Sequence, residues 1–353
     1  MYSCLCSANS DQPELRQAMW KSVPFSPFVL FFVIAAGCTD MIVTEPKNTD
    51  DVADFNSAWQ IVNSVYPYFT YKRINWDSIK TVYLPRAEAA RGDEIDGVLY
   101  DMLAELKDGH VSLQTEGGSS ISTYHPPRVA KDRRAYDPRV VREYFNQQLQ
   151  LAGDQTVEYG IINGVVGYIY VATLSKDEPV TQGFDEALAY VKDTKGLVID
   201  VRADGGGTDN NSVGIESRLL SESIDGLPYY TADGVLHQGG FIAPRGSFQY
   251  TKPVVLLING VCFSACEDFA EMMSHVPTVT LVGDTTAGAS GAPQTFALPS
   301  GRKINVSMKF IPRYDGLPIE WNGVLPNVLV PQTTEDLQQG RDLQLETAIR
   351  LLQ

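Results

Sequence analysis

Apolar residues recur at helical spacing near the start of the chain. Phe55, Trp59, Val62 and Val65 fall on one side of a helix, and a second such run extends over residues 95–106. Amphipathic helices of this kind must bury their apolar faces against each other. The pattern therefore predicts a small N-terminal helical domain over residues 52–114.

The pattern changes to short, β-branched apolar runs further along the chain. Three of these runs are typical of strands buried on both faces, namely residues 165–171, 196–201 and 254–258. Helical segments separate them, so we expect an α/β core over residues 156–335. Residues 336–353 have the spacing of an amphipathic helix that docks on this core.

The formal net charge of the chain is −15, which argues against nucleic acid as a partner. A loop-rich connector over residues 115–155 nevertheless carries a basic cluster. Two interpretations remain open, a solvated surface or a site that binds carboxylates of a substrate. The cluster consists of Arg128, Lys131, Arg133, Arg134, Arg139 and Arg142.

Residues 1–38 have the features of an export signal. The apolar run 28–36 is too short to span a bilayer and is typical of a signal-peptide core. The small residues before Cys38 resemble a bacterial lipobox, which predicts lipidation of Cys38 and a lipid anchor in the membrane. Met19 is then the expected true start, residues 39–51 a tether, and the location the cell envelope. An ordinary cleaved signal peptide is the alternative.

Cys262 and Cys266 are the remaining cysteines after such processing, apart from Cys38. Their spacing matches no zinc site. They could pair in an oxidising compartment, but small buried thiols are the interpretation that we favour from the sequence.

A serine follows the buried strand at residues 254–258. The strand leads into Asn259-Gly260, and a helix is expected to begin at or after Ser264. A hydroxyl beside free helix N–H groups suits a nucleophile whose oxyanion those groups would hold. However, Ser264 and Glu267 also form a capping-box pattern, and on this motif alone the capping interpretation is favoured.

A glycine-rich segment and four histidines complete the candidate chemistry. The strand at residues 196–201 leads into Gly205-Gly206-Gly207, whose spacing is neither a dinucleotide fingerprint nor a phosphate loop. His110, which follows a glycine turn, is slightly favoured as a base over the other histidines. No metal or organic cofactor is expected.

Five segments occur in the order and spacing of the tail-specific (carboxyl-terminal-processing) serine proteases. They are LKDGHVSL, GLVIDVRADGGG, NGVCFSACEDFA, GDTTAGASG and GLPIEWNGVLPN. The chain resembles this family over residues 52–332, and most of all its tricorn-core-like, histidine-dependent branch. The resemblance implies a crotonase/ClpP-like ββα core behind the helical domain, and protein or peptide substrates.

The resemblance also assigns roles. It implies that Ser264 is the nucleophile, His110 the general base and Glu320 the acid that orients the base. The oxyanion hole would be formed by the backbone N–H groups of Ala265 and of Gly206, with Gly207 as the alternative to Gly206. The function implied is an exported serine endopeptidase that forms an acyl-enzyme on Ser264.

Some positions depart from the family pattern. Tricorn-like enzymes have a serine immediately before the histidine, where this chain has Gly109, so Asp108 or a water is a further candidate partner of His110. Ala289 stands where the lysine-dependent branch has its lysine, which favours the histidine mechanism. The connector is too short for a PDZ-like domain. The alternative function is a non-catalytic peptide-binding lipoprotein on the same fold.

Overall fold

The computed structural model describes residues 49–175 and 179–353. The predicted signal peptide, the lipidation site Cys38 and most of the predicted tether lie outside the described residues. All described residues belong to one compact unit. Within them, no helix combines the length and the apolar character that crossing a membrane requires.

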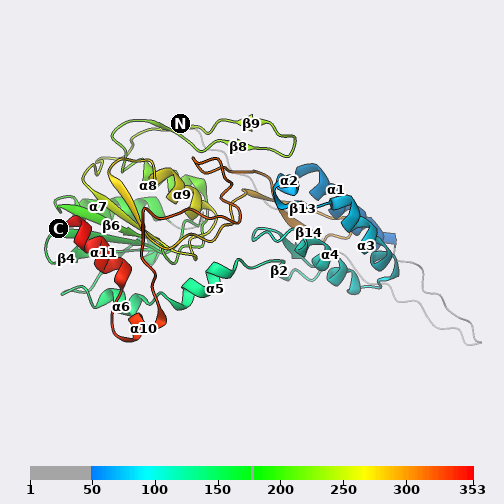
Figure 1. Ribbon diagram of the computed structural model, residues 1–353, viewed down its shortest axis with the longest axis horizontal. Coiled ribbons are helices and arrows are strands. Elements are labelled where there is room, and N and C mark those ends of the chain that lie inside the picture. Colours follow the sequence, from blue (N-terminus) through cyan, green and yellow to red (C-terminus); the bar gives the residue numbers. More distant parts are fainter. Residues whose placement is uncertain (1–48, 176–178) are drawn as a thin grey trace, which may run out of the picture. The chain divides into compact units, whose positions relative to one another are not determined.

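Four helices lie at the N-terminal end of the described chain (Figure 1), and the first and the last of them coincide with the two runs of helical apolar spacing. They are α1 (Thr49–Val65), α2 (Phe69–Lys72), α3 (Trp76–Ala89) and α4 (Glu94–Ala104). The spacing places Phe55, Val62 and Leu99 in a shared core, where each is fully buried. The side chain of Asn75 caps α3 by accepting a hydrogen bond from the backbone of Ser78.

A four-stranded antiparallel sheet completes this helical region. Its order is β13-β14-β1-β2, built from β1 (Ser112–Gln114), β2 (Ser120–Ser122), β13 (Pro293–Ala297) and β14 (Lys303–Ser307). Ile304 and Val306 of β14 are buried in the same core as the helices. Two strands from residues 293–307, which the sequence pattern placed with the α/β core, therefore pack with the N-terminal helices.

A seven-stranded mixed sheet forms the centre of the α/β core. Its order is β15-β12-β11-β6-β5-β4-β3. The strands are β3 (Gln150–Ala152), β4 (Val157–Ile162), β5 (Val166–Val171), β6 (Gly196–Asp200), β11 (Val254–Ile258), β12 (Val279–Gly283) and β15 (Val328–Leu329). The five strands from β5 to β15 run parallel, and β4 and β3 are antiparallel to their neighbours.

Helices cover both faces of this sheet, as continuous apolar strands require. Alternate residues of β11 point to opposite faces: Leu256 packs in the core that includes α7 (Val180–Val191), whereas Leu257 packs with α11 (Leu343–Leu352). The helices α8 (Asp209–Glu216) and α9 (Ala265–Met273) lie on the α7 face. The predicted α/β core with a preceding helical domain is confirmed.

Short elements make up the rest of the described chain. They are α5 (Pro127–Arg134), α6 (Pro138–Arg142), the 3-10 helix Gly153–Gln155, β7 (Ile224–Asp225), β8 (Tyr229–Tyr230), β9 (Leu236–His237), β10 (Phe241–Ile242) and α10 (Thr334–Gln338). β8 pairs with β9, and β10 with β7, both antiparallel.

Candidate active site

Ser264 lies in the turn between β11 and α9, with backbone angles of φ 58° and ψ −128°. A residue other than glycine rarely adopts a positive φ, and such a conformation costs about 1–3 kcal/mol. The Ser264 side chain makes no capping hydrogen bond. Glu267 instead accepts hydrogen bonds from the amides of Gly288 and Ala289. The capping-box interpretation is therefore wrong, and the Ser264 hydroxyl is available for another contact.

That contact is with His110, which precedes β1 and is 154 residues away in the sequence. The His110 Nε2 atom lies 2.8 Å from the Ser264 Oγ atom. Burial lowers the pKa of His110 below its usual value of 6.5, and Lys72 lowers it further, while Asp108 raises it. A neutral imidazole within hydrogen-bond distance of a hydroxyl can accept its proton.

Glu320 is not hydrogen-bonded to His110. Its Oε1 atom accepts a hydrogen bond from the Nζ atom of Lys72 at 2.5 Å. Within the described part of the chain, neither the Oε2 atom of Glu320 nor the Nδ1 atom of His110 has a hydrogen-bond partner. The structure thus brings Ser264 and His110 together but does not place the Glu320 carboxylate on the imidazole.

Asp108 is the carboxylate that binds the His110 backbone. Its Oδ1 atom accepts from the His110 N–H at 2.9 Å and from the Ser307 hydroxyl at 3.1 Å. Its Oδ2 atom accepts from the Tyr66 hydroxyl at 3.0 Å. Asp108 is fully buried, so these bonds fix the turn that carries the imidazole.

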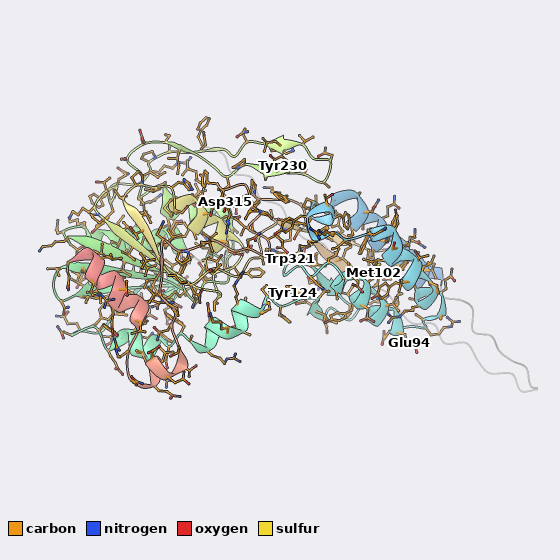
Figure 2. The ribbon with its side chains drawn as sticks, viewed as in Figure 1. Glu94, Met102, Tyr124, Tyr230, Asp315 and Trp321 are labelled. Carbon is orange, nitrogen blue, oxygen red and sulfur yellow. A yellow bond between two sulfur atoms is a disulfide. The ribbon has the colours of Figure 1, made fainter. Side chains whose placement is uncertain are left out.

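Lys72 is a residue of this site that sequence reasoning missed. Its ammonium group, at the end of α2, also donates to the carbonyls of Leu106 and Lys107 and lies 3.8 Å from Asp108. The indole of Trp321, which is labelled in Figure 2, covers it at 4.8 Å and binds the Lys107 carbonyl through its own N–H. No motif marks Lys72 in the sequence, since its role depends on a contact across 248 residues.

Burial raises the pKa of Glu320 well above its usual value, and repulsion from Asp108 raises it further. Lys72 acts in the opposite direction and lowers this pKa. The lysine is therefore the counter-ion of a buried pair of carboxylates.

Gly109 stands where the resemblance implies a serine, and the structure shows what fills that space. A Cβ atom at Gly109 would lie 2.9 Å from a ring carbon of Phe263 and 3.1 Å from the Cβ atom of Ala289. The Phe263 ring also packs on the imidazole of His110, with the ring centroids 4.7 Å apart. A side chain at position 109 would therefore displace Phe263.

The predicted oxyanion donors lie beside Ser264. A Cβ atom at Gly206 would be 2.8 Å from the Ser264 Cβ atom and 3.2 Å from the Ala265 nitrogen. However, the Gly206 N–H already donates to Asp204 at 2.7 Å. This predicted donor is therefore occupied, which leaves Gly207 as the alternative beside Ala265.

Cys262 and Cys266 form a disulfide, so the expectation of free thiols is wrong. Their Cα atoms are 5.4 Å apart, within the usual range for this bond. The bridge closes the turn that carries Ser264.

Three of the six basic side chains of the connector form ion pairs. Lys131 binds Asp284, Arg139 binds Asp137 and Arg142 binds Glu158, all at 2.6–2.7 Å. Arg133 differs, because it lines a cavity of about 220 Å³ together with Gly109, His125 and Phe263. Within the described residues, neither Arg133 nor Arg134 forms an ion pair, so the carboxylate-binding hypothesis is retained for these two side chains.

Comparisons with known proteins show which families the chain is similar to. Residues 165–330 match Peptidase family S41, and residues 52–105 match the Tricorn protease C1 domain. A carboxy-terminal-processing protease from Bartonella bacilliformis is 24% identical over 198 residues, which cover 52% of this chain and 43% of that protein. The chain thus spans less than half the length of this curated relative.

Solved structures agree with the fold. A candidate peptidase from Parabacteroides merdae superposes with a TM-score of 0.75 at 28% identity, covering 86% of this chain and 97% of that one. The tricorn protease gives a TM-score of 0.57 at 17% identity, covering 86% of this chain and 36% of that one, a likeness of fold alone. On the matched segments, the relatives and the fold together, the chain belongs to the tail-specific serine peptidases of family S41.

Proposed function

We propose that this chain is a serine endopeptidase that hydrolyses peptide bonds through an acyl-enzyme on Ser264. The observation that carries the proposal is the 2.8 Å contact between the Ser264 Oγ and His110 Nε2 atoms. The strained backbone of Ser264 supports the proposal, because such strain is concentrated at functional sites. The absence of a capping hydrogen bond supports it as well, because the hydroxyl is left free to react.

In the proposed mechanism, the Ser264 oxygen attacks the substrate carbonyl carbon while its proton passes to the Nε2 atom of His110. The Ala265 and Gly207 amides hold the oxygen of the tetrahedral intermediate. His110 then gives the proton to the leaving amine as the C–N bond breaks. Water attacks the remaining ester with His110 again as base, and Ser264 is restored.

Asp108 and Glu320 have different roles in the proposed mechanism. Asp108 holds the turn of His110 and favours the imidazolium that forms during the reaction, consistent with its effect on the His110 pKa. Glu320 acts through Lys72 as a positioning residue, because Lys72 binds the two carbonyls just before Asp108. Removal of a base or an oxyanion donor in such enzymes costs about 10²–10⁴ in turnover.

We further propose that the protein is exported and anchored to a membrane through lipid on Cys38. The apolar run and small residues before Cys38 support this location. The disulfide between Cys262 and Cys266 supports it independently, since such bonds persist in oxidising compartments.

The test is labelling by a fluorophosphonate probe together with hydrolysis of an unfolded protein. Ser264→Ala is expected to abolish both, whereas Ser274→Ala, at the other end of α9, is the matched control and should retain both. Hydrolysis that persists in Ser264→Ala at the wild-type rate would refute the assignment.

A second candidate is the non-catalytic peptide-binding lipoprotein. The observation that favours it is the His110 Nδ1 atom, which has no hydrogen-bond partner among the described residues. The same probe separates the two functions: a merely binding protein would leave Ser264 unlabelled while still retaining peptides.

A further inference from the structure

A cavity of about 370 Å³ lies between α8, α9 and the β7–β10 region. Its polar lining includes three carboxyl groups, from Asp209, Glu216 and Asp268, and one ammonium group, from Lys309. Figure 2 labels Tyr230, which follows the lining residue Tyr229 in β8. The negative groups thus outnumber the positive one in this cavity.

Glu216 is the residue that points to a ligand. It is only 2% exposed, and its Oε2 atom has no hydrogen-bond partner in the described part of the chain. Burial raises the pKa of Glu216 to about 8, and repulsion from Asp268 and Asp209 adds to this effect. A buried carboxyl group without a partner destabilises a protein, and such a group calls for an explanation by a ligand, an ion or a water.

The other charged groups of the cavity do not provide Glu216 with a positively charged partner. Asp268 accepts a hydrogen bond from the Ser290 hydroxyl, and its pKa is also raised, to about 7, mainly by burial. The Lys309 ammonium lies 4.3 Å from the ring centroid of Tyr229, and its charge lowers the pKa of Asp268 without offsetting the effect of burial. The cavity therefore retains an excess of acidic groups that a cation would neutralise.

The cavity adjoins the nucleophile. Asp268 is four residues after Ser264, and its amide donates to the Ser264 carbonyl at 3.2 Å. Four residues of helix span about 6 Å, which is within the reach of a long side chain. Asp209, which also lines the cavity, begins α8 two residues after Gly207. A peptide held at Ser264 would thus have this cavity beside it.

We propose that the cavity is a subsite for a basic side chain, lysine or arginine, of a peptide substrate, with Glu216 and Asp268 as its recognition groups. The inference rests on the proposed peptidase function, since it names the substrate class of that site. The ammonium or guanidinium group of the substrate supplies the partner that Glu216 lacks, and the apolar wall of Leu227, Ile242 and Met272 packs against the aliphatic stem.

The test measures peptide binding in a protein that lacks the nucleophile. Two peptides that differ only in a central lysine or its uncharged counterpart norleucine are titrated into Ser264→Ala protein at about pH 9, where both carboxyl groups are ionised. The lysine peptide is expected to bind at least about tenfold more tightly, as a charge-assisted hydrogen bond implies. In the Ser264→Ala background, Glu216→Gln should reduce this ratio to about threefold or less, whereas Glu88→Gln, on an exposed face of α3, should not change it.

Each outcome decides between the proposals. Equal binding of the two peptides, no binding of either, or a preference that survives Glu216→Gln overturns the basic subsite. A lysine preference that depends on Glu216, in a protein whose Ser264 does not react with fluorophosphonate, supports the subsite and refutes the peptidase. Circular dichroism checks folding, and Glu216→Gln should be at least as stable as the parent protein because it removes an uncompensated buried acid.

Discussion

Replacement of Lys72 by methionine tests the buried charge network beneath the catalytic pair. The Lys72 side chain is fully buried, and its ammonium lies 2.5 Å from Glu320 and 3.8 Å from Asp108. Methionine keeps most of the aliphatic length but removes the charge and three donated hydrogen bonds. Two buried carboxyl groups then face each other without a counter-ion.

Loss of one partner of a buried ion pair costs about 3–5 kcal/mol of unfolding free energy. The pH dependence adds a second signature. The pKa of Glu320 is raised in the folded protein, so the folded state holds a proton that the unfolded state releases above the usual value of 4.5. Stability from this group is therefore present at low pH and lost as pH rises, and without Lys72, which lowers this pKa, the loss should extend to higher pH.

The assay is urea unfolding followed by tryptophan fluorescence, at several pH values from about 5 to 8. Lys72→Met is expected to lower the unfolding free energy by the amount above, and more at the upper end of the range. The double variant Lys72→Met/Glu320→Gln should recover about 2 kcal/mol or more, because it removes the buried carboxyl group that has lost its partner. A single variant within about 1 kcal/mol of the wild type, or no recovery in the double variant, would contradict this reasoning.

Three further predictions concern the nucleophile and its surroundings. The rate of fluorophosphonate labelling should rise with pH around a midpoint below 6.5, because burial lowers the pKa of His110 and only the neutral ring accepts a proton; a midpoint above 6.5 would exclude this environment. Gly109→Ala should slow labelling, because its Cβ atom would lie 2.9 Å from the Phe263 ring, and Phe263→Leu should restore part of the rate in the double variant. Replacement of Cys262 and Cys266 by alanine should lower the unfolding free energy by about 2 kcal/mol in urea unfolding, the cost expected for opening so short a loop. Thiol titration of the unreduced, urea-unfolded protein should detect neither cysteine; reaction of both would show that the bond does not form.

The local pattern of the chain predicts much of the fold. The apolar run at residues 254–258 is found as β11, and its fully apolar character is explained by packing against helices on both faces. The pairing of β1 with β14 was not predictable in this way, since Ser112 lies opposite Asn305 across almost two hundred residues. Local periodicity identifies a strand but does not specify a distant partner.

The residues of the candidate site also differ in how far the local sequence predicts them. The turn before α9 marks Ser264 in the sequence, because a strand followed by a helix start is a local feature. The choice of His110 required the family resemblance, and the role of Lys72 required the fold itself. The spacing of Cys262 and Cys266 fits a buried thiol pair as well as a disulfide, and only the bond between their sulfur atoms in the structure decides between these alternatives.

The departures from the family pattern are connected to one another physically. Without a side chain at Gly109, the Phe263 ring occupies the adjacent space and restrains the imidazole by packing. Glu320, which has no hydroxyl at position 109 to bind, is instead neutralised by Lys72. A serine restored at position 109 would meet the Phe263 ring at 2.9 Å and an acid already paired with a lysine. Gly109→Ser alone should therefore disturb the site, and a serine-linked arrangement would require changes at Phe263 and Lys72 as well.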